Sequence, residues 1–379
     1  MKQPHLRGIA ATYLRGGTSK GVFFLESDLP ADPAERDAFL LRAMGSPDPY
    51  GKQIDGMGSA TSSTSKVVLV TTDGTSGCDL EYTFGQVAID RPLIDWSGNC
   101  GNLTAAVAPF AIWRGLIPAP NADHVEVTLW QRSIGKRIEA RVPLANGQPL
   151  ETGTFWLDGI AFAGAEIELS FMDPGAGGAL LPTGNSVDLI DLGNGRSIEA
   201  TLIDAGNPSV FVRAVDLGLI GHEHQTEING NAMLLEYCEL VRSHAAVLMG
   251  LATDAAQATR GRPATPKLAF FAAPRDYRSA DGREIKAEQY DVSARILSMG
   301  ALHHAMTGTG GVAIAAAAAL PDTVVSRLLG GPKAQLTFGH PSGTTRVGAT
   351  AVRQAEHWEI ERVTLSRSAR RLMVGTVYG

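Results

Sequence analysis

Cys100 is the residue of this chain best suited to chemistry, because of the stretch in which it lies. The residues around it are small and polar, with Gly98 and Gly101, and an apolar run of helix length starts at Leu103. This pattern predicts a loop that leads into a buried helix, with Cys100 at the helix N-terminus. Free N–H groups and the helix dipole stabilise a thiolate there, and the same groups can hold a carboxylate or an enolate oxygen. The alternative is a structural cysteine beside a tight turn.

Lys66 is the second residue with chemical potential. It opens the strand pattern of residues 67–70 and follows a long loop, residues 46–65, that is rich in Gly, Ser, Thr and Pro. Long ordered loops often line binding sites. A lysine beside buried apolar surface has a lowered pKa and can act as a base or an acid, whereas a lysine at a solvated strand end does neither. The pattern alone leaves both interpretations of Lys66 open.

Length and composition define the class of protein. The 379 residues exceed the usual size of a single core, so two domains are expected. The net charge of −6 gives no reason to expect nucleic acid or an anionic membrane as a partner. The longest apolar run, residues 312–320, is too short to span a bilayer, and the three cysteines have no metal-ligand or disulfide-framework spacing. The start of the chain has no secretory pattern. A soluble, cytoplasmic protein without a metal is expected.

The second half of the chain repeats the first. Three pairs of segments match in the same order with slowly rising offsets, as loop insertions would produce. We therefore expect two similar domains, residues 1–184 and 185–379, that face each other across a cleft, each with an Ala-rich helix inside a curved sheet. The last strand is a candidate to cross back to the first domain. The matching pairs are residues 11–24 with 200–212, 64–70 with 265–271, and 100–113 with 307–320.

Other elements follow from local patterns. A hairpin is expected over residues 6–25, a helix over 32–45 with Asp32 as cap and Gly45 at its end, and an amphipathic helix over 227–249. The Gly/Pro-rich connection 174–184 is the expected domain boundary. Further strands are expected over residues 79–89, 124–132, 136–142, 154–162, 166–171, 336–339, 344–352 and 363–378.

Several sequence blocks resemble those of one enzyme family. They span nearly the whole chain: residues 15–21, 45–56, 64–66, 99–102 and 339–343. These blocks are similar to those of the PrpF-type allylic isomerases, which are cofactor-free enzymes. The resemblance implies the diaminopimelate epimerase fold, an α+β fold of two pseudo-symmetric domains, each with a central helix wrapped by a curved antiparallel β-barrel. It also implies an active site in the cleft between the domains.

One position departs from the epimerases that share this fold. Those enzymes place two cysteines at the two helix N-termini, and here the positions hold Cys100 and Thr307. A threonine hydroxyl is too weak an acid–base group for two-base epimerisation at neutral pH. The resemblance implies instead that Lys66 and Cys100 form a proton-transfer pair. In a 1,3-allylic shift, one proton is removed beside a conjugated C=C, the dienolate is held by hydrogen-bond donors, and a proton is added two carbons away.

Short donors on glycine-containing turns complete the expected site. By resemblance to the family's cleft loops they would bind the substrate carboxylates, although each alone is more often a turn-former. His303 and His304 precede the second loop and are expected to be structural. The expected substrate-binding residues are Thr18, Ser19, Asn99, Gly101, Asn102, Asn207, Thr307, Gly308, Thr309, Ser342 and Gly343.

The expected function is cofactor-independent isomerisation of a small unsaturated di- or tricarboxylate. The main expectation is conversion of 4-oxalomesaconate to 2-keto-4-carboxy-3-hexenedioate, in the protocatechuate 4,5-cleavage route of lignin-derived aromatic degradation. The alternative is 2-methylaconitate cis-trans isomerisation in the methylcitrate cycle. A carboxylate-binding protein without catalysis is a third hypothesis, which the presence of both Lys66 and Cys100 disfavours. A homodimer is the expected assembly.

Overall fold

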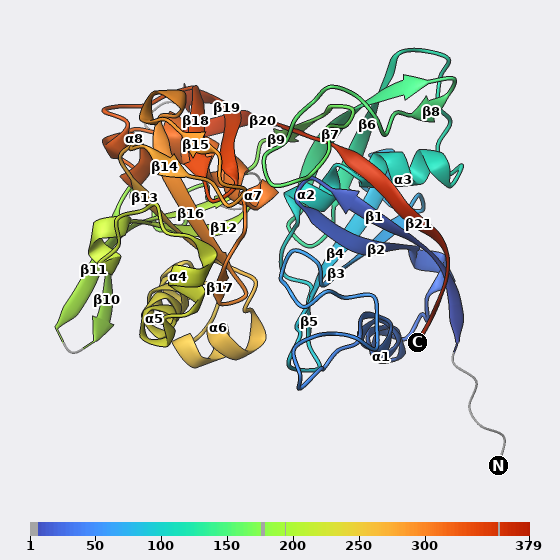
Figure 1. Ribbon diagram of the computed structural model, residues 1–379, viewed down its shortest axis with the longest axis horizontal. Helices are drawn as coiled ribbons and strands as arrows, with labels where there is room; N and C mark the ends of the chain where they lie inside the picture. The colour runs from blue at the N-terminus through green and yellow to red at the C-terminus, as the bar shows by residue number, and fades with distance from the viewer. Residues whose placement is uncertain (1–6, 176–178, 194, 355–356) are drawn as a thin grey trace.

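The computed structural model describes residues 7–175, 179–193, 195–354 and 357–379. In it the strands of the first half lie side by side in one continuous, strongly twisted sheet (Figure 1). The order of hydrogen-bonded neighbours is β21, β1, β2, β3, β4, β6, β7, β9. Neighbours are antiparallel except β2 with β3 and β4 with β6, which are parallel. The bounds are β1 Gly8–Gly16, β2 Ser19–Leu25, β3 Lys66–Thr71, β4 Leu80–Val87, β6 His124–Gln131, β7 Lys136–Ala145, β9 Ile167–Met172 and β21 Ala369–Tyr378.

The strands of the second half repeat this order and its directions. The neighbours are β10, β11, β12, β13, β16, β18, β19 and β20, with parallel pairs at the equivalent places, β12 with β13 and β16 with β18. The two halves join where β20 pairs with β9, and the last strand, β21, pairs with β1. The bounds are β10 Asp188–Gly193, β11 Arg196–Ala205, β12 Asn207–Arg213, β13 Lys267–Ala272, β16 Val292–Ser298, β18 Gln335–His340, β19 Gly343–Gln354 and β20 His357–Arg367.

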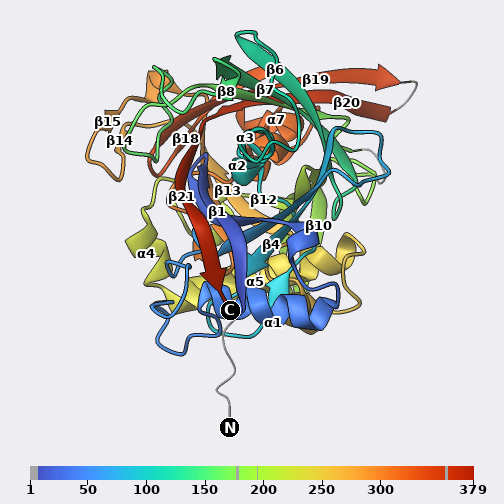
Figure 2. The same ribbon diagram turned by 90° about the vertical axis from the view of Figure 1, so that its right-hand side faces the viewer.

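Each half encloses buried helix, as Figure 2 shows for α2, α3 and α7 among the strands. In the second half α7 (Gly308–Ala319) is buried along its whole length, because its alanines let strands approach from every side. In the first half the predicted single helix is two short ones, α2 (Gly101–Thr104) and α3 (Val107–Trp113). Pro109 explains the break, since it has no N–H to donate to the carbonyl of Ala105 and its ring would collide with that carbonyl.

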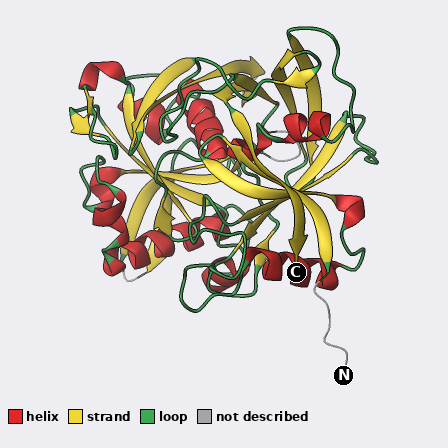
Figure 3. Cartoon of the chain, turned by 45° about the vertical axis from the view of Figure 1, so that its right-hand side comes forward, coloured by secondary structure: helices red, strands yellow, loops and turns green. Residues whose placement is uncertain are grey.

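Helices also cover the outer faces of the sheets (Figure 3). The expected helix α1 (Pro33–Met44) is confirmed, with the Asp32 carboxylate accepting from two N–H groups and Gly45 in the left-handed region. The helix expected over 227–249 is interrupted, because Asn231 starts a new helix by accepting from the Leu234 N–H at 3.1 Å. The outer helices are α4 Gln225–Asn229, α5 Ala232–Leu248, α6 Ala255–Gly261 and α8 Val324–Leu328.

Two strand predictions need correction. The segment 154–162 is a loop with a single bridge between Phe155 and Gly164, because its residues contact the second half instead of pairing with a neighbouring strand. The closing stretch 363–378 belongs to two strands, β20 and β21, that meet at Ser368. Part of the connection 174–184 lies outside the described residues. The remaining short strands are β5 Ile94–Asp95, β8 Gln148–Pro149, β14 Tyr277–Arg278, β15 Glu284–Ile285 and β17 Ala301–Leu302.

No helix within the described ranges is long and apolar enough to cross a membrane.

Candidate active site

The N-termini of α2 and α7 meet at the junction of the two halves. Cys100 and Thr307 are the residues that immediately precede these helices, at equivalent places in the repeat. A Cβ built on Gly101 would lie only 2.8 Å from the backbone carbonyl carbon of Gly308, and a Cβ on Gly308 would collide with the backbone of Asn102. Glycine is therefore needed on both sides for the helices to approach this closely. The two glycines that were expected to bind substrate bring the two helix starts together.

The residues around this junction enclose a small cavity. Its volume is about 10 Å³, enough for no more than about one water molecule, so the groups around it must move before a substrate can enter. Most of the expected site residues meet here. Those that line the cavity are Ser19, Lys66, Asn99, Cys100, Asn102, Asn207, Thr307 and Thr309, together with Phe84, Gln86, Gly98, Ala264, Lys267, Ser298 and His303.

Lys66 is buried in the cavity wall, so the interpretation of Lys66 as a lysine at a solvated strand end is excluded. Its ammonium donates to Gln86 Oε1 at 2.6 Å and lies 4.9 Å from the centre of the Phe84 ring. The amide of Gln86 is itself fixed, because its Nε2 donates to the Ser65 carbonyl at 2.9 Å. Burial lowers the pKa of Lys66, and hydrogen bonding and charge interaction with Cys100 act in the opposite direction. Lys66 and Cys100 thus line the same cavity, close enough for their charges to interact.

Cys100 is 8% exposed, and its thiol points to Ser19 Oγ at 3.8 Å. The cysteine's N–H donates to Asn99 Oδ1 at 2.7 Å. Because α2 has only four residues, its dipole stabilises a thiolate less than the dipole of the predicted long helix would. The positive charges that interact with Cys100 are those of Lys66, Lys267 and Arg367.

Asn99 offers a free donor to the cavity. Its side-chain oxygen accepts from the Cys100 N–H and, at 3.1 Å, from the Tyr82 hydroxyl. Its Nδ2 is buried and has no hydrogen-bond partner among the described residues. An unsatisfied buried N–H is costly, so a group that accepts from it would be held strongly. A substrate carboxylate or dienolate oxygen fits that requirement.

Asn102 lines the cavity, and Thr18 lies behind it. The Asn102 amide donates to Thr18 Oγ1 at 2.9 Å and to the Met306 carbonyl at 3.3 Å, and it accepts from Arg367 Nε at 2.8 Å. Burial lowers the pKa of Arg367 to about 10, and the nearby Cys100 raises it. Arg367 thus fixes the orientation of Asn102, and Thr18 supports it without lining the cavity.

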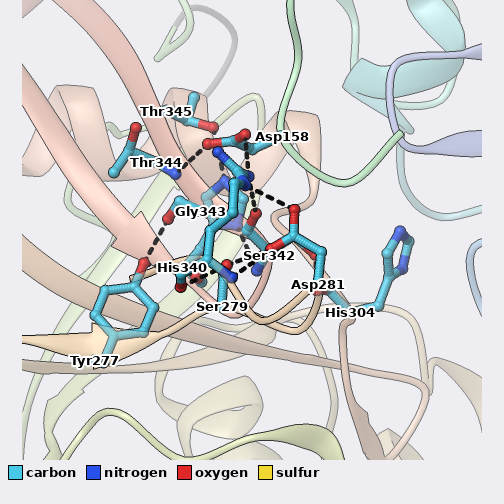
Figure 4. Close-up of polar contacts among 11 residues, drawn as sticks. Asp158, Tyr277, Ser279, Asp281, His304, His340, Ser342, Gly343, Thr344 and Thr345 are labelled. Carbon is cyan, nitrogen blue, oxygen red and sulfur yellow. Dashed lines mark hydrogen bonds and ion pairs between the residues drawn. The ribbon is translucent and has the colours of Figure 1, made fainter. Parts of the chain in front are cut away.

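Ser342 and Gly343 lie elsewhere, in the cluster shown in Figure 4. Ser342 Oγ donates to the His304 carbonyl at 2.6 Å, and a Cβ on Gly343 would overlap the carboxylate of Asp158. That carboxylate pairs with Arg283 at 2.6 Å and accepts from the backbone of β19. Asp158 thus anchors the loop 156–161, and Ser342 lines a separate cavity of about 530 Å³ beside that loop. The glycine-containing sequence pattern at Ser342 and Gly343 correctly predicts a turn, but it does not show which cavity the turn faces.

The structure adds His303 to the site. Its Nδ1 accepts from the Ala305 N–H at 3.1 Å, which leaves the ring proton on Nε2. Burial lowers its pKa well below the usual range, and His304, Lys66 and Lys267 lower it further, so the ring is neutral. His303 therefore adds a neutral side chain to the cavity wall.

Lys267 is the second residue that sequence reasoning did not assign to the site. Its ammonium donates to the Ala264 carbonyl at 3.1 Å and to Ser298 Oγ at 3.2 Å. Burial, and next the charge of Lys66, lower its pKa to about 8. A signal was present, since Thr265-Pro266-Lys267 echoes Thr64-Ser65-Lys66 in the repeat.

Comparison with known proteins gives the family. The chain matches the family model described as "PrpF protein" over residues 6–379, and it therefore belongs to the PrpF family. It is 51% identical to the 2-methyl-aconitate isomerase of Shewanella oneidensis, over 97% of this chain and 96% of that protein. It is 35% identical to the (4E)-oxalomesaconate Delta-isomerase of Novosphingobium sp. strain KA1, over 97% and 96%. The protein is an isomerase of this family.

Solved structures agree with the fold class. A methylitaconate-delta-isomerase superposes with a TM-score of 0.76 at 35% identity, over 98% of this chain and 96% of that one. A hydroxyproline epimerase from Agrobacterium vitis shares the fold, with a TM-score of 0.55 at 13% identity over 98% and 93%. The expected epimerase-like fold is confirmed. Two details differ from the expectation: the first half encloses the two helices α2 and α3 instead of one, and each half contains parallel as well as antiparallel strand pairs.

Proposed function

We propose that this protein interconverts the cis and trans isomers of 2-methylaconitate. The observation that carries the proposal is the 51% identity to a 2-methyl-aconitate isomerase over nearly the whole chain, against 35% for an oxalomesaconate isomerase. The sequence-based preference for 4-oxalomesaconate therefore has less support than its alternative. Both are tricarboxylates, and a cavity with two buried lysines and the unpaired Asn99 Nδ2 suits either, so the polar groups alone do not separate them.

The chemistry follows from the substrate's bonds. The methylene of 2-methylaconitate is allylic and lies beside a carboxylate, so a base can remove one of its protons. The C–H electrons then form a new double bond, and the original C=C becomes the single C–C bond of a dienolate. Rotation about that bond and return of a proton to the same carbon give the other geometrical isomer. Return of the proton to the methyl-bearing carbon would give a 1,3-shifted product instead.

Lys66 and Cys100 are the proposed proton-transfer pair. A single proton shared between thiol and amine gives a thiolate and an ammonium, whose mutual attraction offsets part of the cost of burying them. The thiolate would remove the methylene proton, and the ammonium would hold the charge that develops on the dienolate or return a proton to it. Asn99 Nδ2, which has no partner among the described residues, would donate to an oxygen of the dienolate.

A turnover assay with both acids tests the proposal. We expect the purified protein to equilibrate cis- and trans-2-methylaconitate with a kcat/KM at least about 100-fold above that for 4-oxalomesaconate, and to place deuterium from D₂O on the methylene carbon. Preference for 4-oxalomesaconate would overturn the proposal in favour of the original expectation. Binding of both acids without turnover of either would favour the non-catalytic hypothesis.

Assembly and location stay predictions. We expect a homodimer, which light scattering coupled to size exclusion would detect as a mass near twice that of the 39.9 kDa chain. A cytoplasmic location is likewise expected, and fractionation of the source cells would test it.

A further inference from the structure

Lys66 and Lys267 are equivalent residues of the repeat. Each is the first residue of its strand, β3 or β13, and each strand runs parallel to the second strand of its hairpin in the same register. Both side chains are buried and line the same small cavity, one from each half of the molecule. The cavity therefore has an ammonium group on each side.

Neither ammonium has a carboxylate partner within the part of the chain that the structure describes. Their recorded partners are an amide oxygen for Lys66, and a carbonyl and a hydroxyl for Lys267. The nearby carboxylate of Asp95 is already engaged, by the N–H and hydroxyl of Ser97 and by the N–H of Ala264. Two buried like charges that face one cavity destabilise each other, and the single thiolate of Cys100 can offset only one of them, so a further anion between them stabilises the pair.

We propose that Lys267 contacts a carboxylate of the substrate and, with Lys66 on the opposite side, completes a site for a polyanion. The inference rests on the proposed function, because it assumes that the anion is the tricarboxylate substrate. Two of the three ammonium N–H groups of Lys267 donate to Ala264 and Ser298, and the third is available to the substrate. Lys267 is thus a binding residue, while Lys66 and Cys100 transfer protons.

The proposal explains how a cavity of about 10 Å³ can be a substrate site. When the halves are apart, each lysine can be hydrated. A tricarboxylate between them supplies the counter-charge that both need as the halves close. Closure then depends on an anion that reaches both lysines, which favours acids with carboxylates at both ends over monocarboxylates.

Binding of a substrate-like acid that cannot react tests this directly. Propane-1,2,3-tricarboxylate has the three carboxylates and no double bond. We expect Lys267→Met to weaken its binding about 100-fold, measured by calorimetry, and to abolish the rise in Tm that the ligand gives the wild type. Without ligand, Lys267→Met should melt at the wild-type temperature or above it, because an uncompensated buried charge is gone.

Lys20→Met is the matched control. Lys20 follows Ser19 on β2, but its ammonium lies over the Tyr13 ring at 5.4 Å and does not line the cavity. This variant loses the same charge and should bind propane-1,2,3-tricarboxylate within about twofold of the wild type. If both variants bound the acid equally weakly, the effect would come from the loss of net charge alone, and the proposal would be overturned.

Kinetics with 2-methylaconitate separate binding from proton transfer. Lys267→Met should raise KM much more than it lowers kcat, whereas Lys66→Met should mainly lower kcat. A large fall in kcat with unchanged KM for Lys267→Met would overturn the binding role, and so would a lower Tm with unchanged affinity for the saturated acid. If the wild type binds that acid through Lys267 yet does not isomerise 2-methylaconitate, the proposed function fails and the polyanion site stands.

Discussion

Asn99 and Asn207 exchange two hydrogen bonds of 2.8 Å across the junction of the two halves. The Asn99 N–H donates to Asn207 Oδ1, and Asn207 Nδ2 donates to the Asn99 carbonyl. The same Nδ2 lies 3.2 Å from Thr309 Oγ1 at the start of α7. One side chain of the second half thus holds the backbone just before Cys100 and sets its position relative to Thr309.

Asn207→Ala should therefore damage both stability and activity. It leaves the N–H and carbonyl of Asn99 buried without their partner, at a cost of about 1–3 kcal/mol. We expect a lower midpoint in urea unfolding and a kcat reduced by about tenfold or more, since Cys100 loses its fixed position. Asn185→Ala is the control, because Asn185 is exposed and, within the described residues, the recorded hydrogen bond of its side chain is to Asp188 at 2.8 Å. An Asn207→Ala enzyme with wild-type kcat would show that the pair is not needed to position the thiol.

Gly101→Ala should reduce turnover more than the small size of the added methyl group suggests. The added methyl would lie 2.8 Å from the carbonyl carbon of Gly308, so the starts of α2 and α7 would have to separate. We expect turnover to fall at least about 100-fold and the cavity to open, with the thiol reacting faster with an alkylating reagent. Gly375→Ala on β21 is the control, because a Cβ there meets no atom within 4 Å. A fully active Gly101→Ala enzyme would contradict the close contact of the two helices.

Much of this fold could be predicted from the sequence, because strands and caps are local patterns. The repeat was detectable because both halves keep the same strand order around helices that start at Cys100 and Thr307. The break between α2 and α3 was also predictable from Pro109 in the sequence, but the continuous apolar run favoured the prediction of a single helix. The loop 154–162 was not predictable, since alternating apolar residues pack equally well in a strand or against a distant surface.

The site was predictable only in part. The blocks that resemble the family include Lys66 and Cys100, and their small cavity is where the two halves meet. Lys267 was missed because the sequence does not distinguish a buried lysine from a surface lysine. Only the fold shows which cavity the start of a strand faces. The structure places Ser342 beside a different cavity, with its hydroxyl donating to the His304 carbonyl, so its contact with a substrate stays a prediction.

Activity should survive removal of metal ions. Among the described residues, no group of three or more His, Cys, Asp or Glu side chains is arranged to hold an ion. The proposed dienolate is held by N–H donors and lysines. We expect dialysis against a strong chelator to leave turnover of 2-methylaconitate unchanged. A loss that a divalent ion restores would show that a metal contributes to the reaction.

Lys66→Met and Cys100→Ser should each lower turnover by about 100-fold or more, the usual scale for general acid–base groups. For cis-trans isomerisation the wild type should exchange protons with D₂O at the methylene alone, which proton NMR can follow. If Cys100 removes that proton, Cys100→Ser should lose both exchange and turnover. Full exchange in Cys100→Ser would assign the thiol a structural role and leave Lys66 to act alone or with water. Deuterium at the methyl-bearing carbon would show a 1,3-shift.

The pH dependence of stability should report the buried ammonium of Lys267. Burial and the charge of Lys66 hold its pKa near 8 in the folded protein, against an ordinary value of 10.5. The unfolded chain therefore binds more protons between about pH 8 and pH 10.5, so the contribution of this group to stability rises with pH across that range. Below pH 8 the group costs the wild type on the order of 3 kcal/mol, and above pH 10.5 the cost vanishes.

Lys267→Met removes this dependence, and urea unfolding of both proteins at pH 7 and pH 10 measures it. The variant should be the more stable protein at pH 7, and its advantage should shrink at pH 10. Groups far from the cavity titrate equally in both proteins, so the difference reports Lys267 together with Lys66 and His303, whose titration is coupled to it. Affinity of the wild type for propane-1,2,3-tricarboxylate should fall above pH 8, as the ammonium loses its proton, while that of the variant should change less. A stability difference that is the same at both pH values would mean that Lys267 is not a buried charge in the free protein.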